Sequence, residues 1–255
     1  MEKERIINLN FYRPEIDGLR AIAILSVILY HTKIQYKGIY FFDGGYLGVD
    51  IFFVISGYLI SRSIISEWLL TKKFDFKKFY IKRARRILPM LFLVIIASFP
   101  LAWILLLPTN FIEYAKSILS SIFGWSNLFF YFNTTQYGAE SSLFKPFLHT
   151  WSLGIEEQFY LIFPILSILI LKFFRNYFLS IGTLLFILSL IFAEYMIPLN
   201  PELNFYLPLS RFWELLIGSA LAYKEIYFEE TKGNSFIKFI PNLGIILVIY
   251  GLAVF

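Results

Sequence analysis

Hydrophobic residues fall into eight long runs that are separated by short polar segments. Each run is close to the roughly 20 residues that an α-helix needs to cross a bilayer. A backbone exposed to lipid must satisfy its own hydrogen bonds, so we predict that the runs are helices. The pattern therefore predicts an all-α fold, a polytopic bundle of transmembrane helices. The runs cover residues 17–34, 46–66, 87–107, 111–132, 151–171, 177–197, 208–224 and 238–255.

The composition agrees with a membrane protein. The chain is 58% hydrophobic and 16% charged, and it has no cysteine. Soluble domains carry more charge than this, and the lack of cysteine excludes disulfides and thiolate metal sites. The net charge of +5 comes from basic residues beside the apolar runs. Such residues set membrane orientation, so we expect no nucleic-acid binding. The chain also lacks the His-Glu-x-x-His pattern of zinc enzymes, and we expect no bound metal.

Basic residues predict the orientation of the chain. Four lie between Lys3 and Arg20, and eight lie between Lys72 and Arg86. Loops rich in Lys and Arg face the cytoplasm. We therefore expect the N-terminus and the loop after the second run to face the cytoplasm, and the protein to lie in the inner (cytoplasmic) membrane. The basic loop 172–175 would face outward if runs 111–132 and 151–171 both crossed. We expect run 111–132, the more polar of the two, to be re-entrant or packed against the bundle.

The last run stops at Phe255 in mid-pattern. We therefore treat residues 1–255 as one membrane domain and expect its C-terminal helices to be missing from this chain.

His31 is the first candidate for chemistry. It lies near the end of the first apolar run, which carries Arg20 at its other end. Ionisable groups in membrane segments are costly and mark functional sites. Fourteen residues separate Asp17 from His31, roughly 21 Å of helix, which places His31 toward the outer side. Asp50 opens the second run at a similar depth, and a carboxylate beside an imidazole suits a general base. The alternative is an interfacial histidine bonded to a carbonyl at a helix end.

The basic segment 77–89 is the second candidate. Arg83 and Arg86 are three residues apart, so they share one helix face and together could clamp phosphates. Pro89 suits the first turn of the helix that follows. Two simpler interpretations stay open: a flank that stops translocation, and a patch for anionic lipid headgroups.

Two further polar clusters lie in the second half of the chain. The stretch 147–160 places His149, Glu156, Gln158 and Tyr160 at the start of an apolar run. The helix dipole accounts for acids at such a start, but the deeper polar groups should face the bundle interior. Arg211 stands three residues before Glu214, and the two either pair with each other or line a cavity.

These clusters, in this order, resemble the acyltransferase 3 family of membrane-bound acyltransferases, which includes bacterial O-acetylases of lipopolysaccharide and other surface glycans. The resemblance runs from Tyr12 to about Gly218. The stretches that carry it are YRPEIDGLRAIAILSVILYH (12–31), GYLGVDIFFVISGYLIS (45–61), FYIKRARRILP (79–89), HTWSLGIEEQFYLIFP (149–164) and RFWELLIG (211–218).

The resemblance implies a role for each matching residue. His31 is expected to be the essential catalytic histidine, supported by Asp50, with Arg20 as a second important charge. The family's Arg-x-x-Arg pair falls on Arg83 and Arg86 and is expected to bind the acyl-CoA donor. The remaining positions are expected to line the cavity for substrate, and they are His149, Glu156, Gln158, Tyr160 and Arg211.

These inferences predict an acyltransferase that moves an acyl group, most simply acetyl, from acyl-CoA to a hydroxyl of a cell-surface or lipid-linked glycan. Acyl-CoA is a donor substrate here, and we expect no permanently bound cofactor. His31 acts either as a general base or as a transiently acylated nucleophile. A transporter or flippase that uses the same buried charges is the alternative, although the chain shows no internal repeat. A scaffold or sensor with a lipid-binding basic loop is a further alternative.

Overall fold

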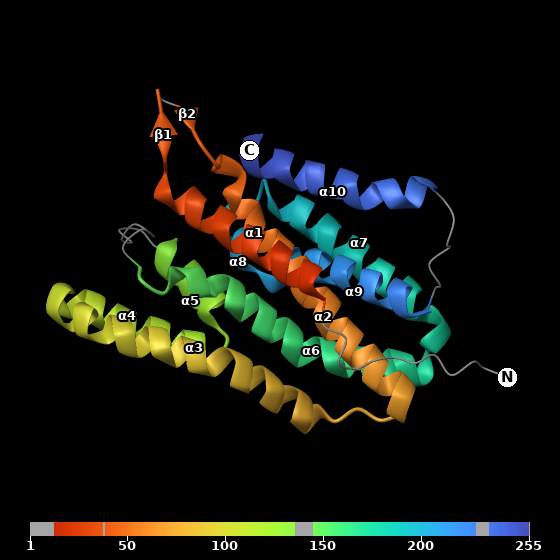
Figure 1. Cartoon of the computed structure of the whole chain (residues 1–255). Helices are drawn as coiled ribbons and strands as arrows, with labels where there is room; N and C mark the ends of the chain where they lie inside the picture. Colours follow the sequence, from red (N-terminus) through yellow and green to blue (C-terminus); the bar gives the residue numbers. More distant parts are fainter. Residues whose placement is uncertain (1–12, 38, 136–144, 228–234, 255) are drawn as a thin grey trace. The chain divides into compact units, whose positions relative to one another are not determined.

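The computed structural model describes residues 13–37, 39–135, 145–227 and 235–254, and within these it is almost entirely helical (Figure 1). The exception among the described residues is a short antiparallel hairpin of β1 (Gln35–Tyr36) and β2 (Ile39–Tyr40). The predicted all-α class is therefore confirmed. Four described stretches are long and apolar enough to cross a membrane, namely Asp43–Thr71, Phe76–Leu105, Leu148–Phe173 and Arg175–Met196. The protein is a multi-pass membrane protein.

The chain divides into two compact units, which we describe separately. The first unit combines the residues up to Leu70 with those from Glu214 onward, and the second unit spans Thr71–Trp213. The first unit holds α1 (Pro14–Thr32), η1 (Asp43–Tyr46), α2 (Leu47–Thr71), most of α9 (Phe212–Tyr227) and α10 (Ser235–Val254).

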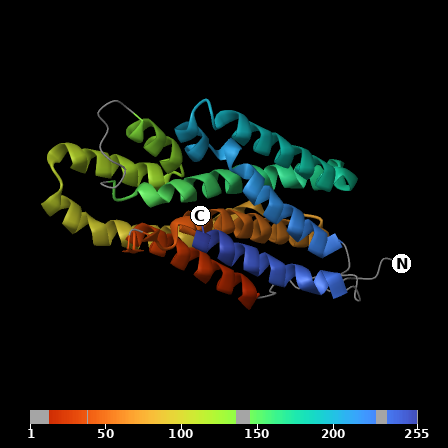
Figure 2. The same cartoon turned by 90° about the horizontal axis from the view of Figure 1, so that it is seen from above.

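Glycines let the helices of the first unit approach closely. A Cβ atom on Gly45 would lie 2.2 Å from the Ser26 carbonyl oxygen of α1, and one on Gly44 would lie 2.0 Å from the Gly251 carbonyl oxygen of α10. Both distances are shorter than any contact that a real Cβ atom makes with a carbonyl oxygen, so only glycine fits at these positions. Small residues at helix contacts are typical of membrane proteins, where close packing drives association. As a result α1 and α10 both pack against η1 (Figure 2).

The contact between α2 and α9 is built in the same way. A Cβ atom on Gly57 would meet the Leu215 carbonyl oxygen at 1.9 Å, and one on Gly218 would meet the Val54 carbonyl oxygen at 2.0 Å. One turn further along, the buried hydroxyl of Ser61 donates to Ser219 over 2.6 Å. A hydrogen bond between small polar side chains strengthens such a crossing in lipid.

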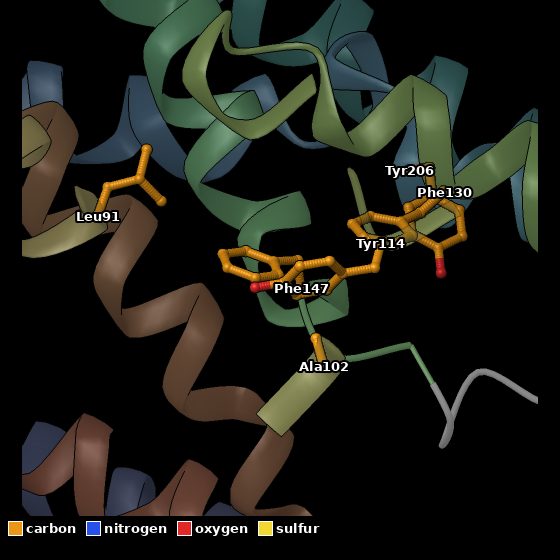
Figure 3. Packing of buried hydrophobic residues seen from close by; sticks show 6 residues of the cluster. All are labelled: Leu91, Ala102, Tyr114, Phe130, Phe147 and Tyr206. Atoms are coloured by element: carbon orange, nitrogen blue, oxygen red, sulfur yellow. The ribbon is translucent and has the colours of Figure 1, made fainter. Parts of the chain in front are cut away.

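The second unit holds the remaining helices, with short 3₁₀ turns between some of them. Six residues form its buried core (Figure 3). They are Leu91 and Ala102 of α3 (Phe76–Leu105), Tyr114 of α4 (Pro108–Ile122), Phe130 of α5 (Ser126–Thr134), Phe147, and Tyr206 of α8 (Pro201–Tyr206). The elements are α3 (Phe76–Leu105), α4 (Pro108–Ile122), α5 (Ser126–Thr134), η3 (Leu148–Thr150), α6 (Trp151–Phe173), η4 (Arg175–Tyr177), α7 (Phe178–Met196), α8 (Pro201–Tyr206) and η5 (Pro208–Ser210).

Helix α3 corrects one expectation. We predicted that Pro89 lies in the first turn of a helix, but α3 already begins at Phe76, where the side chain of Asp75 accepts a hydrogen bond from the backbone N–H of Lys78 at 2.9 Å. Pro89 and Pro100 both lie inside the helix. A proline removes one backbone hydrogen bond, and membrane helices tolerate this loss. The basic segment is therefore the first part of the same helix that continues as the apolar span.

The polar run 111–132 is broken into two helices. The chain turns at Gly124, whose φ is +70°, between the 15 residues of α4 and the 9 residues of α5. Each helix is shorter than the roughly 20 residues that a crossing requires. Polar side chains of the run bond to the residue that precedes α6. Ser121 shares a 2.7 Å hydrogen bond with the hydroxyl of Thr150, and Ser126 donates to the Thr150 carbonyl at 2.6 Å.

Candidate functional site

His31 lies in the last turn of α1, and its side chain is exposed. Its ring meets the Tyr30 ring edge to face, with centroids 5.2 Å apart. Arg20, three turns earlier on the same helix, forms an ion pair with Asp17 at 3.3 Å. The imidazole at the end of α1 is therefore accessible to a substrate. A residue that transfers a proton must be accessible in this way.

Asp50 lies half-buried in the first turn of α2. A Cβ atom on the nearby Gly48 would lie 2.5 Å from the Ala23 carbonyl oxygen, so this end of α2 lies beside the middle of α1. Asp50 is two residues further along α2, about 3 Å of helix. Asp50 and His31 thus belong to the same unit. Their direct pairing stays a prediction.

Arg83 and Arg86 have different surroundings. The guanidinium carbon of Arg83 lies 5.6 Å from the ring centroid of Tyr160 and 5.5 Å from that of Phe79. These distances are within the range of cation–π attraction. The Arg83 side chain is half-buried, whereas Arg86 is exposed. The pair therefore combines a fixed guanidinium with one that is accessible to a ligand.

Tyr160 connects Arg83 to a carboxylate. The Tyr160 hydroxyl donates to Glu156 Oε2 over 2.6 Å, one turn earlier on α6. The neighbouring Tyr80 hydroxyl donates to the Leu161 carbonyl at 3.0 Å, which fixes the same level of α3 against α6. Tyr160 is the tenth residue of α6, so Arg83 lies beside the middle of that helix.

Gln158 lies half-buried on α6, and its side chain is hydrogen-bonded. Its side-chain amide donates to the Gly124 carbonyl and to Asn127 Oδ1, both at 2.8 Å. The Asn127 amide in turn donates to the Tyr206 carbonyl at 3.0 Å. Buried polar groups in a membrane protein need such partners. Gln158 of α6 thus holds the turn at Gly124, between α4 and α5, against α6 by hydrogen bonds.

His149 and Arg211 lie near the start of α6. The exposed His149 ring stacks on Phe147 with centroids 6.1 Å apart. The Arg211 guanidinium carbon lies 5.9 Å from the Trp151 ring and 5.3 Å from the Phe205 ring. Trp151 and Tyr160 are nine residues apart on α6, about 13 Å of helix. The two aromatic-bound arginines therefore contact α6 at different levels.

The first unit contains a charged cluster that sequence reasoning missed. Arg13, just before α1, donates to the Tyr58 hydroxyl at 2.9 Å and to Glu225 at 3.0 Å. Arg62 donates to the same hydroxyl at 2.6 Å and to Glu225 at 2.7 Å. The Tyr58 hydroxyl completes the cluster by donating to Glu225. Arginine and tyrosine inside the apolar run 46–66 were the available signal, because ionisable residues in such runs find partners.

The electrostatics of this cluster keep Arg13 charged. Partial burial lowers the pKa of Arg13, but its hydrogen bond to Tyr58 and its attraction to Glu225 and Glu15 raise the pKa by more. The net shift of the pKa is upward, so Arg13 stays a cation. The cluster links the start of α1 to α2 and α9. His31 lies at the other end of α1.

Among the described residues, no group of three His, Cys, Asp or Glu side chains lies close enough together to hold a metal ion.

Comparison with known proteins identifies the family. A family model described as an acyltransferase domain, acyltransferase 3, matches residues 13–255. This chain belongs to the acyltransferase 3 family. No solved structure matches it.

Curated relatives agree with the family. The chain is 35% identical over 216 residues to the peptidoglycan O-acetyltransferase OatA of Listeria monocytogenes. It is 37% identical over 220 residues to the O-acetyltransferase OatA of Staphylococcus aureus. Both alignments cover 83% of this chain and 34% of the relative. The chain thus spans about a third of the length of these relatives.

Proposed function

We propose that the protein is an O-acetyltransferase that moves an acetyl group from acetyl-CoA to a hydroxyl of a cell-envelope polysaccharide, most directly peptidoglycan. The observation that carries this proposal is the similarity to two O-acetyltransferases across 83% of the chain. The exposed imidazole of His31, at the end of a helix within the family's region, supports it.

The proposed reaction uses His31 as a general base. The imidazole takes the proton of the acceptor hydroxyl while the acceptor oxygen attacks the thioester carbonyl. The carbon–sulfur bond then breaks, and the CoA thiolate takes a proton from the imidazolium. The products are an O-acetyl ester and free CoA. A positioned general base contributes about 10² to 10⁴ in rate. A route through an acetylated His31 is the alternative, and it yields the same products.

The proposed donor site is the Arg83 and Arg86 pair on α3. Guanidinium groups bind phosphates through paired hydrogen bonds, and CoA carries several phosphate groups. The positive-inside rule assigns the basic start of α3 and the N-terminus to the cytoplasm, where acetyl-CoA is made. We place the protein in the cytoplasmic membrane on this basis, with residues 13–255 as one acyltransferase domain.

The test is the O-acetyl content of the polysaccharide in cells. Cells that lack the gene are complemented with the wild-type gene, with His31→Ala or with Thr32→Ala. Thr32 is the exposed neighbour of His31, so its variant controls for local disturbance. Mild base releases ester-bound acetate from the purified polysaccharide, and the acetate is then quantified.

We expect the wild-type gene and Thr32→Ala to restore the acetate and His31→Ala to leave it at the level of the deletion. Equal protein amounts in the membrane are verified by immunoblot. Full acetylation in cells that carry His31→Ala would overturn the role of His31, and unchanged acetate in the deletion itself would overturn the proposed activity.

A further inference from the structure

The exposed end of α1 carries an organised cluster of side chains around the ring of Tyr30. His31 meets this ring edge to face at 5.2 Å, and Tyr46 of η1 meets it edge to face at 5.9 Å. The ammonium group of Lys33 lies 3.9 Å from the ring centroid, well within the range of cation–π attraction. Three side chains from the end of α1 and from η1 thus gather on one tyrosine.

The backbone holds this cluster in place. Lys33 is in the left-handed region, with φ 50° and ψ 38°, and its N–H bonds to the Tyr30 carbonyl at 3.4 Å. This ends α1 and turns the chain so that Lys33 lies over Tyr30. A Cβ atom on Gly45 would lie 2.8 Å from the Cβ atom of Tyr30, so η1 is pressed against the same residue. The positions of Lys33 and Tyr46 therefore follow from backbone packing.

The cluster is accessible and carries positive charge. The side chains of Lys33 and Tyr46 are 53% and 46% exposed, and His31 is exposed as well. Asp43 lies 4.0 Å from the Lys33 ammonium, a long ion pair that leaves donor positions on the ammonium for a further partner. Lys33 and Lys37 outnumber the single acid, Asp43, between His31 and Tyr46. An anionic ligand is favoured here.

From this arrangement we infer that Lys33 and Tyr46 form the acceptor-binding surface, which holds a carboxylate-bearing polysaccharide beside His31. The inference rests on the proposed function. A polymer is too large to enter a helix bundle, so its hydroxyl must reach the imidazole at an exposed surface. Tyrosine rings pack on the apolar C–H faces of sugars while their hydroxyl groups form hydrogen bonds. Lys33 supplies a charged hydrogen bond to a carboxylate.

The experiment compares two soluble acceptors that differ only in charge. One is a fragment of the polysaccharide with free carboxylates, and the other is the same fragment with its carboxylates amidated. Transfer from labelled acetyl-CoA is measured with the full-length protein in membranes. The variants are Lys33→Glu, the milder Lys33→Gln, Tyr46→Leu and the control Lys116→Glu, which changes an exposed lysine of α4.

We expect Lys33→Glu to raise the KM for the carboxylate-bearing fragment about tenfold, because one charged hydrogen bond to the acceptor is lost. Its KM for the amidated fragment and for acetyl-CoA should stay unchanged, and Lys33→Gln should give a smaller change in the same direction. Tyr46→Leu should raise the KM for both fragments, because sugar packing does not depend on the carboxylate. Lys116→Glu should match the wild type.

An unchanged ratio of the two KM values in both Lys33 variants would overturn the inference. A second result would also overturn it: the variants keep the wild-type KM values, but less of each variant protein is found in the membrane. The cluster would then be an interfacial anchor. Failure of the proposed function looks different: the wild-type protein would then acetylate neither fragment.

Discussion

The guanidinium of Arg83 lies over the ring of Tyr160, 5.6 Å from its centroid, and this contact joins the basic start of α3 to the middle of α6. Tyr160 also donates a hydrogen bond to Glu156. The chain Arg83–Tyr160–Glu156 thus places one guanidinium of the proposed donor site in a fixed position. Fixed binding groups cost less conformational entropy when a ligand is bound.

Two substitutions at Tyr160 separate the ring contact from the hydrogen bond. Tyr160→Phe keeps the ring beneath Arg83 and loses the bond to Glu156, whereas Tyr160→Leu loses both. We expect a small rise in the KM for acetyl-CoA with Tyr160→Phe and a rise of about fivefold to tenfold with Tyr160→Leu, since a partly desolvated cation–π contact contributes about 1 kcal/mol. Equal KM values for the two variants would show that the ring does not position Arg83.

The proposed donor site also predicts which arginines of α3 matter. Arg86→Ala should raise the KM for acetyl-CoA about tenfold, because a charge-assisted hydrogen bond to phosphate is lost. Arg85→Ala is the matched control, since Arg85 is also exposed, lies on the same turn and is outside the Arg-x-x-Arg pair. The KM is measured with labelled acetyl-CoA in membranes. A similar rise in both variants would favour general attraction by a basic lipid-facing patch over a specific clamp.

The sequence was informative about the long helices and less so about their ends. Hydrophobic runs located α2, α6 and α7 to within a few residues, because each needs an apolar stretch as long as the bilayer is thick. The predicted start of α3 at residue 87 was wrong, because the helix already begins at Phe76 and includes the basic segment. Lys and Arg are good helix formers, so the helix continues through them, although their charge ends the apolar pattern.

Candidate residues were easier to find than their partners. His31 and Tyr160 stood out because polar residues are rare in apolar runs, and Arg83 stood out because it shares a helix face with Arg86. The role of Gln158 was less visible, because its partners, the Gly124 carbonyl and Asn127, follow from a helix break more than 30 residues earlier. Contacts between distant residues depend on packing that a single sequence does not reveal.

The cluster around Glu225 illustrates the same point and gives a stability prediction. Arg13 and Glu225 are 212 residues apart in sequence, yet their side chains lie 3.0 Å apart. Glu225→Gln removes the charge that two guanidinium groups share and should lower the free energy of unfolding by about 1–3 kcal/mol. Thermal unfolding of the purified protein in detergent measures this, with the exposed neighbour Lys224→Ala as control. Equal melting temperatures for the two variants would contradict a stabilising role for the cluster.

The close contact of α2 and α9 predicts a strict size limit at Gly57. Gly57→Ala would place a methyl group 1.9 Å from the Leu215 carbonyl oxygen, so the helices must move apart. We expect a loss of about 1–3 kcal/mol of stability and less protein in the membrane. Gly182→Ala in α7 is the control, since nothing lies within 4 Å of its added Cβ. Normal stability of Gly57→Ala would show that α2 and α9 pack less closely than described.

The most direct test of acetyl transfer through His31 follows labelled acetyl groups from acetyl-CoA to the polysaccharide in membranes of known protein content. We predict that the wild-type protein transfers label and that His31→Ala, present in the same amount and given saturating acetyl-CoA, is slower by at least about 100-fold, the lower range of a lost general base. Transfer by His31→Ala at the wild-type rate would contradict a catalytic role for this histidine.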